Sequence, residues 1–308
     1  MFTFIDLFAG IGGFRIALQR QGLNCIFTSE IDEKARRVYE RNFNDKTHGD
    51  IRKIKERDIP RHDILCAGFP CQSFSISGKR TGLNDKRGFL FYEIVRIARY
   101  HKPLVLLLEN VMNILTIDNS EVIKNIHKEL NDIGYDVRYC ILNASEFGYP
   151  QSRKRVYFVC LKKEANLDFR PPFPTRKPIF LRDMLESNTD ERLIIKRDDI
   201  VFRTTNEPKP KLAPIRIGEI DKGCQGYRIY HPNGHAVNLN ANSGGMGAKT
   251  GLYLIDGKVR KLSVVECRRL MGFEECHYVD SGVHGYRQVN NAVIPGMIEK
   301  VFQSIKFL

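Results

Sequence analysis

Long apolar runs and internal repeats are missing from this chain of 308 residues. Its strongest apolar run, Leu104 to Leu108, is far shorter than the roughly 20 residues that a membrane-spanning helix needs. The first apolar segment carries Asp6 and has no basic region or cleavage site, so we expect no signal peptide. Without repeats or low-complexity tracts, a solenoid or a disordered protein is also excluded. We therefore expect no membrane partner and a cytoplasmic protein.

Paired cysteines are missing too. The eight cysteines form no C-x-x-C pair, and no histidine stands at zinc-finger spacing. We therefore expect neither a disulfide framework nor a metal site. The cysteines are at positions 25, 66, 71, 140, 160, 224, 267 and 276.

Cys71 differs from the other cysteines, most of which we expect to be buried small apolar residues. It follows Pro70 within CAGFPCQSFSISGKR, directly after an apolar run, a pattern typical of a strand that ends in a loop. Basic residues at 79, 80, 86 and 87 favour a thiolate, which is the reactive form of cysteine. The sequence therefore predicts that Cys71 is an exposed nucleophile.

Acidic residues are outnumbered by basic ones. The net charge is +13 and the isoelectric point is about 9.4, which suggests a polyanionic partner because Lys and Arg release counterions from phosphates. A mean hydropathy of −0.33 and a hydrophobic fraction of 42% indicate a soluble globular chain. Charge alone also fits a basic face that is simply solvated.

Strands and helices alternate through the first half of the chain. An apolar strand at 2–9 runs into a glycine turn at 10–14 and a helix at 15–21, and this unit predicts a doubly wound α/β fold with a mostly parallel sheet. The glycine spacing departs from G-x-G-x-x-G, which argues against an NAD-binding turn. Further strands are predicted at 24–29, 63–67, 103–108, 136–142 and 155–161, and helices at 32–43 and 120–133.

Chemically active side chains follow the ends of the predicted strands. Glu30 follows the second strand, Asp50 a short third segment, Cys71 the fourth strand and Glu109 the fifth. In open α/β sheets ligands bind beyond the carboxyl ends of the strands, and an acid after the second strand commonly binds ribose hydroxyls. Glu30 alone fits equally well an acid that complements a helix dipole.

The composition changes after the first predicted domain. Prolines cluster at 171–178 and 208–214, and the segment 223–251 is rich in glycine and asparagine. We predict three segments: a catalytic domain at 1–165, a small loop-rich recognition domain at 166–259, and a C-terminal segment at 260–308 that returns to the catalytic domain. The middle segment also fits a surface domain with flexible turns. Ser263 and Glu266 form a predicted capping box that opens a helix, and helical periodicity resumes at Ile298.

One reaction uses a thiolate, a carboxyl group, arginines and an adenosine-type pocket together. Adding a thiolate to carbon 6 of cytosine makes carbon 5 nucleophilic, and this splits one difficult step into two. A carboxyl group such as Glu109 can hydrogen-bond N3 and the exocyclic amine, and an arginine can hold O2. The methyl donor would be S-adenosylmethionine, with its ribose and adenine near Glu30 and Asp50.

Six ordered motifs carry a family resemblance. They are DLFAGIGGF (6–14), GFPCQSFSISGKR (68–80), ENV (109–111), QSRKR (151–155), RKLSVVECRRLMGF (260–273) and QVNNAV (288–293). Together they resemble the cytosine-C5 DNA methyltransferases, and most of all the compact bacterial restriction-modification enzymes of the HhaI type. The resemblance covers essentially the whole chain. It implies a class I S-adenosylmethionine-dependent, Rossmann-like fold with a small target-recognition domain.

The resemblance also implies roles for individual residues. The implied catalytic residues are Cys71 as nucleophile, Glu109 at cytosine N3, and Arg153 and Arg155 at the flipped cytosine and nearby backbone. The implied cofactor contacts are Phe8, Gly10, Ile11, Gly13, Glu30, Ile31, Asp50, Ile51, Pro70, Leu90, Asn291 and Ala292. The implied DNA contacts are Ser75, Ser77, Lys79, Gln225, Arg228, Asn238, Asn240, Asn242, Gly244 and Gly245. The loop 72–88 would act as a lid, with Ser77 and Gln225 filling the space that the flipped base leaves.

Three positions depart from the family pattern. Ile31 stands where relatives have a tryptophan, Asn290 replaces a glycine and Ala292 replaces a hydroxyl residue. Alternatives remain: a tRNA cytosine-C5 methyltransferase of the same framework, a non-catalytic DNA-binding relic and, more distantly, an NAD-dependent reductase. The first interpretation implies a prokaryotic monomer on double-stranded DNA, located at the nucleoid when bound and encoded near a cognate restriction endonuclease.

Overall fold

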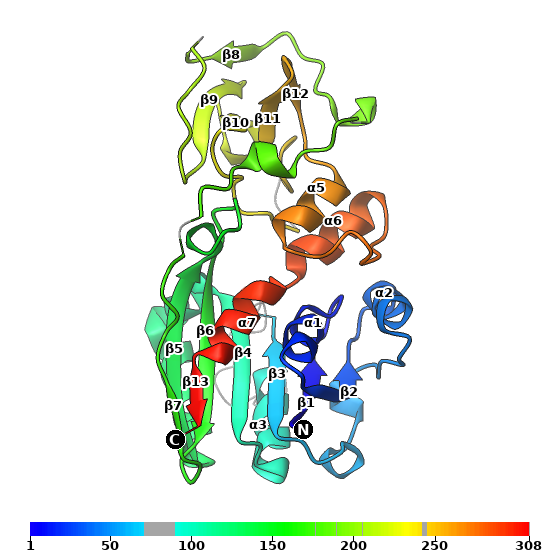
Figure 1. Ribbon diagram of the computed structural model, residues 1–308, viewed down its shortest axis with the longest axis vertical. Helices are drawn as coiled ribbons and strands as arrows, with labels where there is room; N and C mark the ends of the chain where they lie inside the picture. The colour runs from blue at the N-terminus through cyan, green and yellow to red at the C-terminus, as the bar shows by residue number, and fades with distance from the viewer. Residues whose placement is uncertain (71–89, 176, 189, 205, 242–244, 308) are drawn as a thin grey trace. The chain divides into compact units, whose positions relative to one another are not determined.

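A computed structural model describes residues 1–70, 90–175, 177–188, 190–204, 206–241 and 245–307 (Figure 1). The chain divides into two compact units. The first consists of Met1–Leu142, Lys154–Pro172 and Pro295–Leu308, and the second of Asn143–Arg153 and Phe173–Ile294. None of the helices in the described ranges is long and apolar enough to cross a bilayer.

A six-stranded sheet forms the centre of the first unit (Figure 1). Strands β2, β1, β3 and β4 pair in parallel, and β6 joins β4 in antiparallel orientation. The predicted α/β fold with a mostly parallel sheet is thus confirmed. In spatial order the strands are β2 (Asn24–Ser29), β1 (Thr3–Leu7), β3 (Ile64–Gly68), β4 (Val105–Val111), β6 (Lys154–Lys162) and β5 (Tyr135–Asn143).

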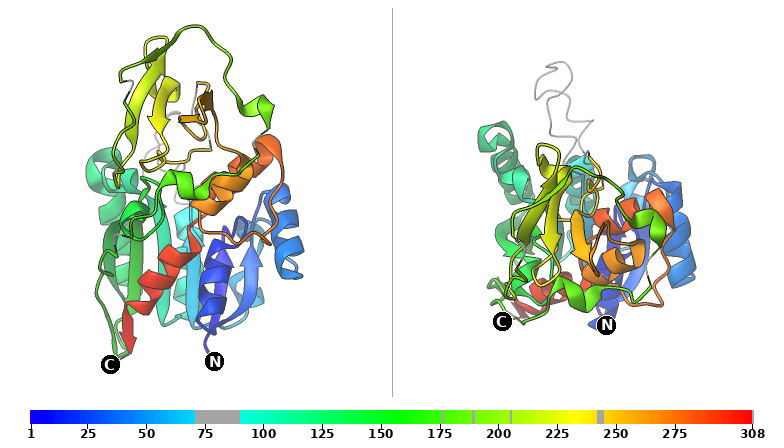
Figure 2. Two further views of the ribbon diagram at one scale, coloured as in Figure 1. Left: turned by 45° about the horizontal axis from the view of Figure 1, so that its top comes forward. Right: turned by 90° about the horizontal axis from the view of Figure 1, so that it is seen from above.

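Helices cover both faces of this sheet, as the two views in Figure 2 show. On one face α1 and α7 lie side by side, and Arg20 of α1 is paired with Glu299 of α7 (2.9 Å). On the other face α3 and α4 pack on alternate strand residues such as Ile5 and Leu7. The helices of this unit are α1 (Gly13–Arg20), α2 (Glu33–Phe43), α3 (Leu90–His101), α4 (Glu121–Asp132) and α7 (Pro295–Gln303).

Gly12 is the position in the glycine turn where only glycine fits. Its φ of +91° lies in the left-handed region, and a Cβ there would lie 2.2 Å from the ring of Phe43. The same ring packs against Tyr39 of α2. The close approach at this glycine therefore packs the turn before α1 directly against the aromatic side chains of α2.

Some elements differ from the predicted bounds. Strand β4 continues to Val111, because pairing with β6 extends to the Val111–Arg155 register, so Glu109 lies inside the strand and not after it. Helix α7 begins at Pro295 instead of Ile298, since proline suits the first turn of a helix. Two helices were not predicted, α3 and α6 (Gly282–Asn291). A short pair, β7 (Leu167–Phe169) and β13 (Ile305–Phe307), completes the first unit.

The second unit contains a five-stranded sheet of short strands. A small core of Ile195, Ile217, Ile220, Ile229, Leu252 and Val259 packs against it. Only β10 and β11 are parallel neighbours. In spatial order the strands are β12 (Lys258–Arg260), β11 (Leu252–Ile255), β10 (Arg228–His231), β9 (Ile215–Ile220) and β8 (Ile200–Phe202).

The bounds of the second unit differ from the predicted segments. The loop 143–153 belongs to it because Ser152 donates its amide N–H to Ala236 O (2.8 Å) and Ala236 donates to Pro150 O (2.8 Å). Residues 260–294 belong to it as well, where 260–308 had been expected to return to the catalytic domain. Within the last segment, residues 295–308 do lie in the first unit.

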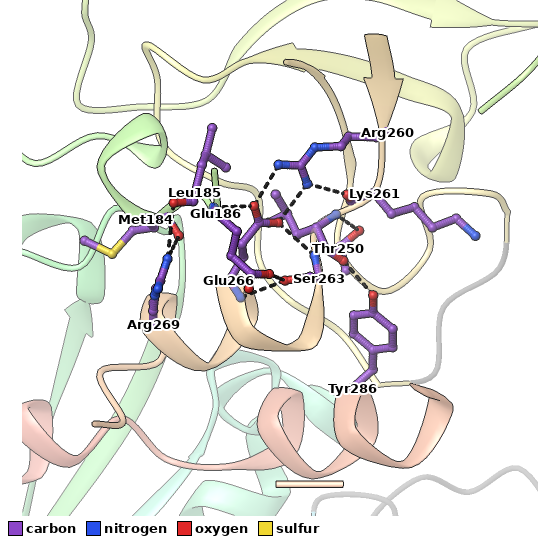
Figure 3. A network of polar contacts seen from close by, with 11 residues as sticks. Met184, Leu185, Glu186, Thr250, Arg260, Lys261, Ser263, Glu266, Arg269 and Tyr286 are labelled. Atoms are coloured by element: carbon purple, nitrogen blue, oxygen red, sulfur yellow. Dashed lines mark hydrogen bonds and ion pairs between the residues drawn. The ribbon is translucent and has the colours of Figure 1, made fainter. Parts of the chain in front are cut away.

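A buried ion pair anchors helix α5 (Val264–Leu270) in this unit (Figure 3). Arg260 donates to both carboxylate oxygens of Glu266 at 2.8 and 2.7 Å, and the two side chains are 4% and 0% exposed. The same carboxylate accepts the amide N–H of Ser263, whose hydroxyl accepts the amide N–H of Glu266, so the predicted capping box is confirmed. Tyr286 of α6 adds a bond from its hydroxyl to Leu262 O (2.6 Å).

Candidate functional site

A cavity of about 240 Å³ lies at the carboxyl ends of the first strands. Its walls combine two carboxylates, a guanidinium group and several apolar side chains. Ile31, an aliphatic residue, is 62% exposed there. Predicted cofactor residues in the lining are Phe8, Glu30, Ile31, Asp50, Ile51, Pro70 and Leu90, and residues not predicted are Ser29, Gly49 and Arg52.

Glu30 ties the end of β2 to the glycine turn. One carboxylate oxygen accepts the amide N–H of Gly10 (2.8 Å), and the other accepts that of Asp32 (2.7 Å), at the N-cap of α2. Burial raises the pKa of Glu30 above its ordinary value, while these amide donors oppose the rise. A carboxylate offers about four acceptor positions, so Glu30 can still accept a hydroxyl from a ligand in the cavity.

Asp50 is held by its neighbour Arg52. The guanidinium contacts both carboxylate oxygens at 2.7 to 3.0 Å, and this hydrogen bonding lowers the pKa of Asp50. Asp50 also caps the short 3-10 turn that begins at Ile51. Arg52 is therefore a cavity residue that sequence reasoning missed, although an arginine two positions after a capping aspartate was a usable signal.

The other predicted cofactor residues are more dispersed. Gly10 and Gly13 belong to the turn before and at the start of α1, and Ile11 is buried beside them. These three do not line the cavity among the described residues. Asn291 and Ala292 belong to the second compact unit, at the end of α6.

Asp6 is a fully buried carboxyl group on β1 that the sequence reasoning did not assign to the site. Neither of its oxygens has a hydrogen-bond partner within the described ranges, and its strand neighbours are Thr28 and Cys66. Burial raises the pKa of Asp6 to about 8, with Glu30 adding to the rise and Arg15 opposing it. The carboxyl group therefore holds a proton at neutral pH.

We expect Asp6→Asn to reduce the pH dependence of stability. The native pKa of about 8 lies above the ordinary 3.8, so the folded protein binds a proton that the unfolded chain releases. The stability that this proton supplies is complete below about pH 4 and is lost as pH rises toward 8. Urea unfolding at several pH values in this window measures the effect. An unchanged slope in the asparagine variant would contradict the assignment.

Glu109 and Arg155 form an ion pair between the neighbouring strands β4 and β6. Arg155 on β6 lies opposite Val111 on β4, and Glu109, two residues earlier, points to the same face. Arg155 Nε lies 3.1 Å from Glu109 Oε1, and both side chains are 11% exposed. The pair presents a carboxylate and a guanidinium side by side, which suits a planar ring with neighbouring donors and acceptors.

Asn110 positions the chain just before Cys71. Its side-chain amide donates to Phe69 O (2.8 Å), and its oxygen accepts the amide N–H of Val111 (2.8 Å). Asn110 is buried, so the main chain at Phe69 is fixed one residue before Pro70. Cys71 itself, the predicted lid at 72–88 and the predicted DNA contacts Ser75, Ser77 and Lys79 lie outside the described residues.

Arg153 has a different setting from Arg155. It is 3% exposed, and its guanidinium donates to three main-chain oxygens of the second unit, Leu239 O (3.3 Å), Asn290 O (3.2 Å) and Ala292 O (2.9 Å). These bonds join three segments that are distant in sequence. The geometry favours a supporting role for Arg153 over the predicted contact with a flipped cytosine.

Several predicted DNA contacts gather in the second unit. Gln225 is exposed in a 3-10 turn, and Arg228 follows it at the start of β10, with Nε donating to Gly223 O (3.2 Å). Gly226 between them packs against Gly245, where a Cβ would lie 3.0 Å away. Asn238 and Asn240 are exposed and alternate with the buried Leu239 and Ala241. Asn242 and Gly244 lie outside the described part of the chain.

Comparison with known proteins identifies the family. The model of the C-5 cytosine-specific DNA methylase family matches residues 2–307. The Type II methyltransferase M.HhaI of Haemophilus parahaemolyticus is 43% identical over 307 residues, which is 98% of this chain and 93% of that protein. The Type II methyltransferase M.HpaII of Haemophilus parainfluenzae is 38% identical over 99% of this chain and 89% of its own length.

Solved structures share the fold. The Dnmt2 methyltransferase of S. pombe has a TM-score of 0.76 at 18% identity, over 98% of this chain and 97% of that one. A putative DNA modification methyltransferase encoded in an E. coli prophage has a TM-score of 0.74 at 21% identity, over 99% and 98% of the two chains. With a family model that covers nearly every residue, the chain belongs to the C-5 cytosine-specific DNA methylase family and is a DNA (cytosine-5-)-methyltransferase.

Proposed function

We propose that this enzyme methylates a cytosine within a short, palindromic duplex site, with S-adenosylmethionine as the methyl donor. We further propose that it is the modification enzyme of a restriction-modification system. The observation that carries the catalytic part is the Glu109–Arg155 pair, which lies on neighbouring strands next to the chain segment that leads into Cys71. Relatives named as Type II methyltransferases, at 43% and 38% identity, support the biological role.

The cavity at Glu30 suits the adenosine part of S-adenosylmethionine. A carboxylate in the cavity wall fits ribose hydroxyls, and the exposed aliphatic face of Ile31 fits an aromatic base. Arg52 restrains Asp50, which also lines the cavity and suits a base amine. When bound, the cofactor supplies an electrophilic methyl group. The chain's residues would bind and orient it through Glu30, Ile31 and the other residues that line the cavity.

The roles of the catalytic residues follow from their chemistry. The Cys71 thiolate adds to carbon 6 of the cytosine, and the displaced electron pair makes carbon 5 nucleophilic. When the cytosine binds, Glu109 takes up a proton and shares it with N3, which stabilises the charge that develops there, and its second oxygen accepts from the exocyclic amine. Arg155 holds Glu109 in place and can donate to the cytosine O2. After methylation, water takes the carbon 5 proton as the carbon 6–sulfur bond breaks, which returns the Cys71 thiolate and restores the aromatic ring.

Access to both faces of the ring requires that the cytosine leaves the DNA stack, so we infer that the enzyme flips its target base. The second compact unit would read the site through Gln225, Arg228, Asn238 and Asn240. Its exposed amide and guanidinium groups suit base edges in the major groove. The net charge of +13 supports binding to the phosphate backbone. A monomer suffices, because the two strands of a palindrome can be modified in turn.

We expect expression of the wild-type chain in a methylation-deficient host to protect one cytosine of a short motif from bisulfite conversion. Plasmid from a host with Cys71→Ala should show complete conversion, because alanine cannot form the covalent bond. Bisulfite sequencing of both plasmids measures this directly. Protection that persists in the alanine variant would contradict the assignment of the nucleophile.

Uniform conversion with soluble wild-type protein would contradict the proposed DNA activity. Labelled methyl transfer to duplex DNA and to tRNA, measured in parallel, then distinguishes the tRNA alternative from a non-catalytic relic. The family match favours DNA, because the matched model describes DNA methylases.

A further inference from the structure

Asn290 is a buried residue that the catalytic proposal leaves unused. It lies in the last turn of α6, is 3% exposed, and is one of the positions where the sequence departs from its motif. Its side-chain nitrogen donates to two main-chain oxygens, Asn240 O (3.2 Å) and Lys249 O (3.1 Å). All three residues belong to the second compact unit.

The two acceptors of Asn290 are already neighbours. The amide N–H of Asn240 donates to Lys249 O (3.1 Å), so the chain closes on itself at this point. The Asn290 amide lies across this closure and binds both sides of it. Only the nitrogen can face two carbonyl oxygens favourably, which fixes the orientation of the amide. Its oxygen has no hydrogen-bond partner in the described ranges, so the two donated bonds are what justify its burial.

Leu239, the residue before Asn240, is held in the same way by two other buried side chains. Gln151 Oε1 accepts the amide N–H of Leu239 (3.3 Å), and Arg153 donates to Leu239 O (3.3 Å). Arg153 also donates to the carbonyl oxygen of Asn290 (3.2 Å). The polar main-chain groups of residues 239 and 240 are therefore held by Gln151, Arg153, Asn290 and Lys249.

Asn238 and Asn240 have exposed side chains and stand on either side of the buried Leu239 in the sequence. Further along, Gly247 donates its amide N–H to Gly226 O (2.7 Å), which links the segment to the turn that carries Gln225. Because successive side chains of an extended segment point to opposite sides, fixing the main chain at 239 and 240 also fixes where Asn238 and Asn240 point.

We propose that Asn290 is a specificity-positioning residue, which sets the placement of Asn238 and Asn240 for base reading without touching DNA. The inference rests on the proposed function, in which these two asparagines read the site. The test uses Asn290→Asp, which places a carboxylate against two carbonyl oxygens, and Asn290→Gly, which removes the side chain without adding charge. Asn131→Asp, at an exposed position in α4, is the control for the same chemical change.

The readout is kinetic discrimination on DNA duplexes. Bisulfite sequencing with wild-type protein first defines the target, and duplexes with that target or a single mismatch are then compared. For Asn290→Asp we expect the KM for target DNA to rise about tenfold, as two lost hydrogen bonds imply. The ratio of kcat/KM for target over mismatch should fall about tenfold, while the KM for S-adenosylmethionine stays within about twofold. Asn131→Asp should match wild type.

The possible failures are distinguishable. A wild-type enzyme that methylates no defined sequence would refute the proposed function itself. A wild-type enzyme with a defined target, and Asn290 variants that keep its discrimination ratio while their melting temperatures fall, would refute the positioning role alone. If Asn290→Asp does not fold, Asn290→Gly decides in the same assay, since it introduces no charge.

Discussion

Glu109→Gln is expected to lower kcat by about 100-fold to 10,000-fold, the range that a positioned proton donor contributes. Glutamine keeps the size of the side chain, but it cannot supply a proton to N3 of the cytosine or carry the charge that pairs with Arg155 (3.1 Å). Transfer of a labelled methyl group to the target duplex measures the effect. Binding of S-adenosylmethionine should persist, because Glu109 does not line the cavity at Glu30 among the described residues.

Glu121→Gln is a suitable control for this variant. Glu121 lies on α4, is 56% exposed and pairs only at the surface with Lys124, so its replacement should leave kcat unchanged. A Glu109 variant with kcat within a few-fold of wild type would overturn its role. A loss of activity together with a loss of cofactor binding would indicate a structural defect instead of a missing proton donor.

Glu266→Ala is expected to destabilise the second unit by about 3–5 kcal/mol, since removing one partner leaves the other charge buried and uncompensated. The remaining charge is that of Arg260, whose side chain is 4% exposed. The variant also loses the capping box at Ser263, which closes the first turn of α5. The chain has no tryptophan, so urea unfolding followed by far-ultraviolet circular dichroism is the appropriate measurement.

Asp190→Ala provides the comparison for the buried pair. Asp190 pairs with Arg192 at the surface, where the arginine side chain is 89% exposed, so solvent screens the pair and its loss should destabilise the protein far less. If both variants lose the same small amount of stability, the Arg260–Glu266 pair is not a structural anchor. A double replacement of Arg260 and Glu266 by methionine should recover much of the loss, because it removes both buried charges.

Local patterns in the sequence predicted most of the first unit and one helix start in the second. Strand β2 at Asn24–Ser29, helix α2 after Asp32, and the capping box at Ser263 were all predicted, because apolar periodicity and capping side chains act over a few neighbouring residues. The apolar spacing of Phe91, Ile94, Val95 and Ala98 would have predicted α3 as well. This helical spacing was present in the sequence, but the prediction for this region rested on the motif at 68–80.

Partners in the site could not be predicted in the same way. The motif QSRKR contains Arg153 and Arg155 two positions apart, and the two were assigned together to the flipped cytosine and nearby backbone. In the structure Arg155 pairs with Glu109 across the sheet, whereas Arg153 is buried against the carbonyl oxygens of Leu239, Asn290 and Ala292. The difference arises because β6 begins at Lys154, and this boundary depends on pairing with β4.

The sequence by itself therefore determined the α/β class, the ordered motifs and the family, since each depends on residue types at short spacing. Only the tertiary structure decided that Asp6 is buried with a raised pKa and that Asn290 binds Asn240 and Lys249. These properties depend on which residues meet after the chain has folded. Burial and long-range hydrogen bonds, unlike the periodicity of helices and strands, produce no pattern of fixed spacing in the sequence.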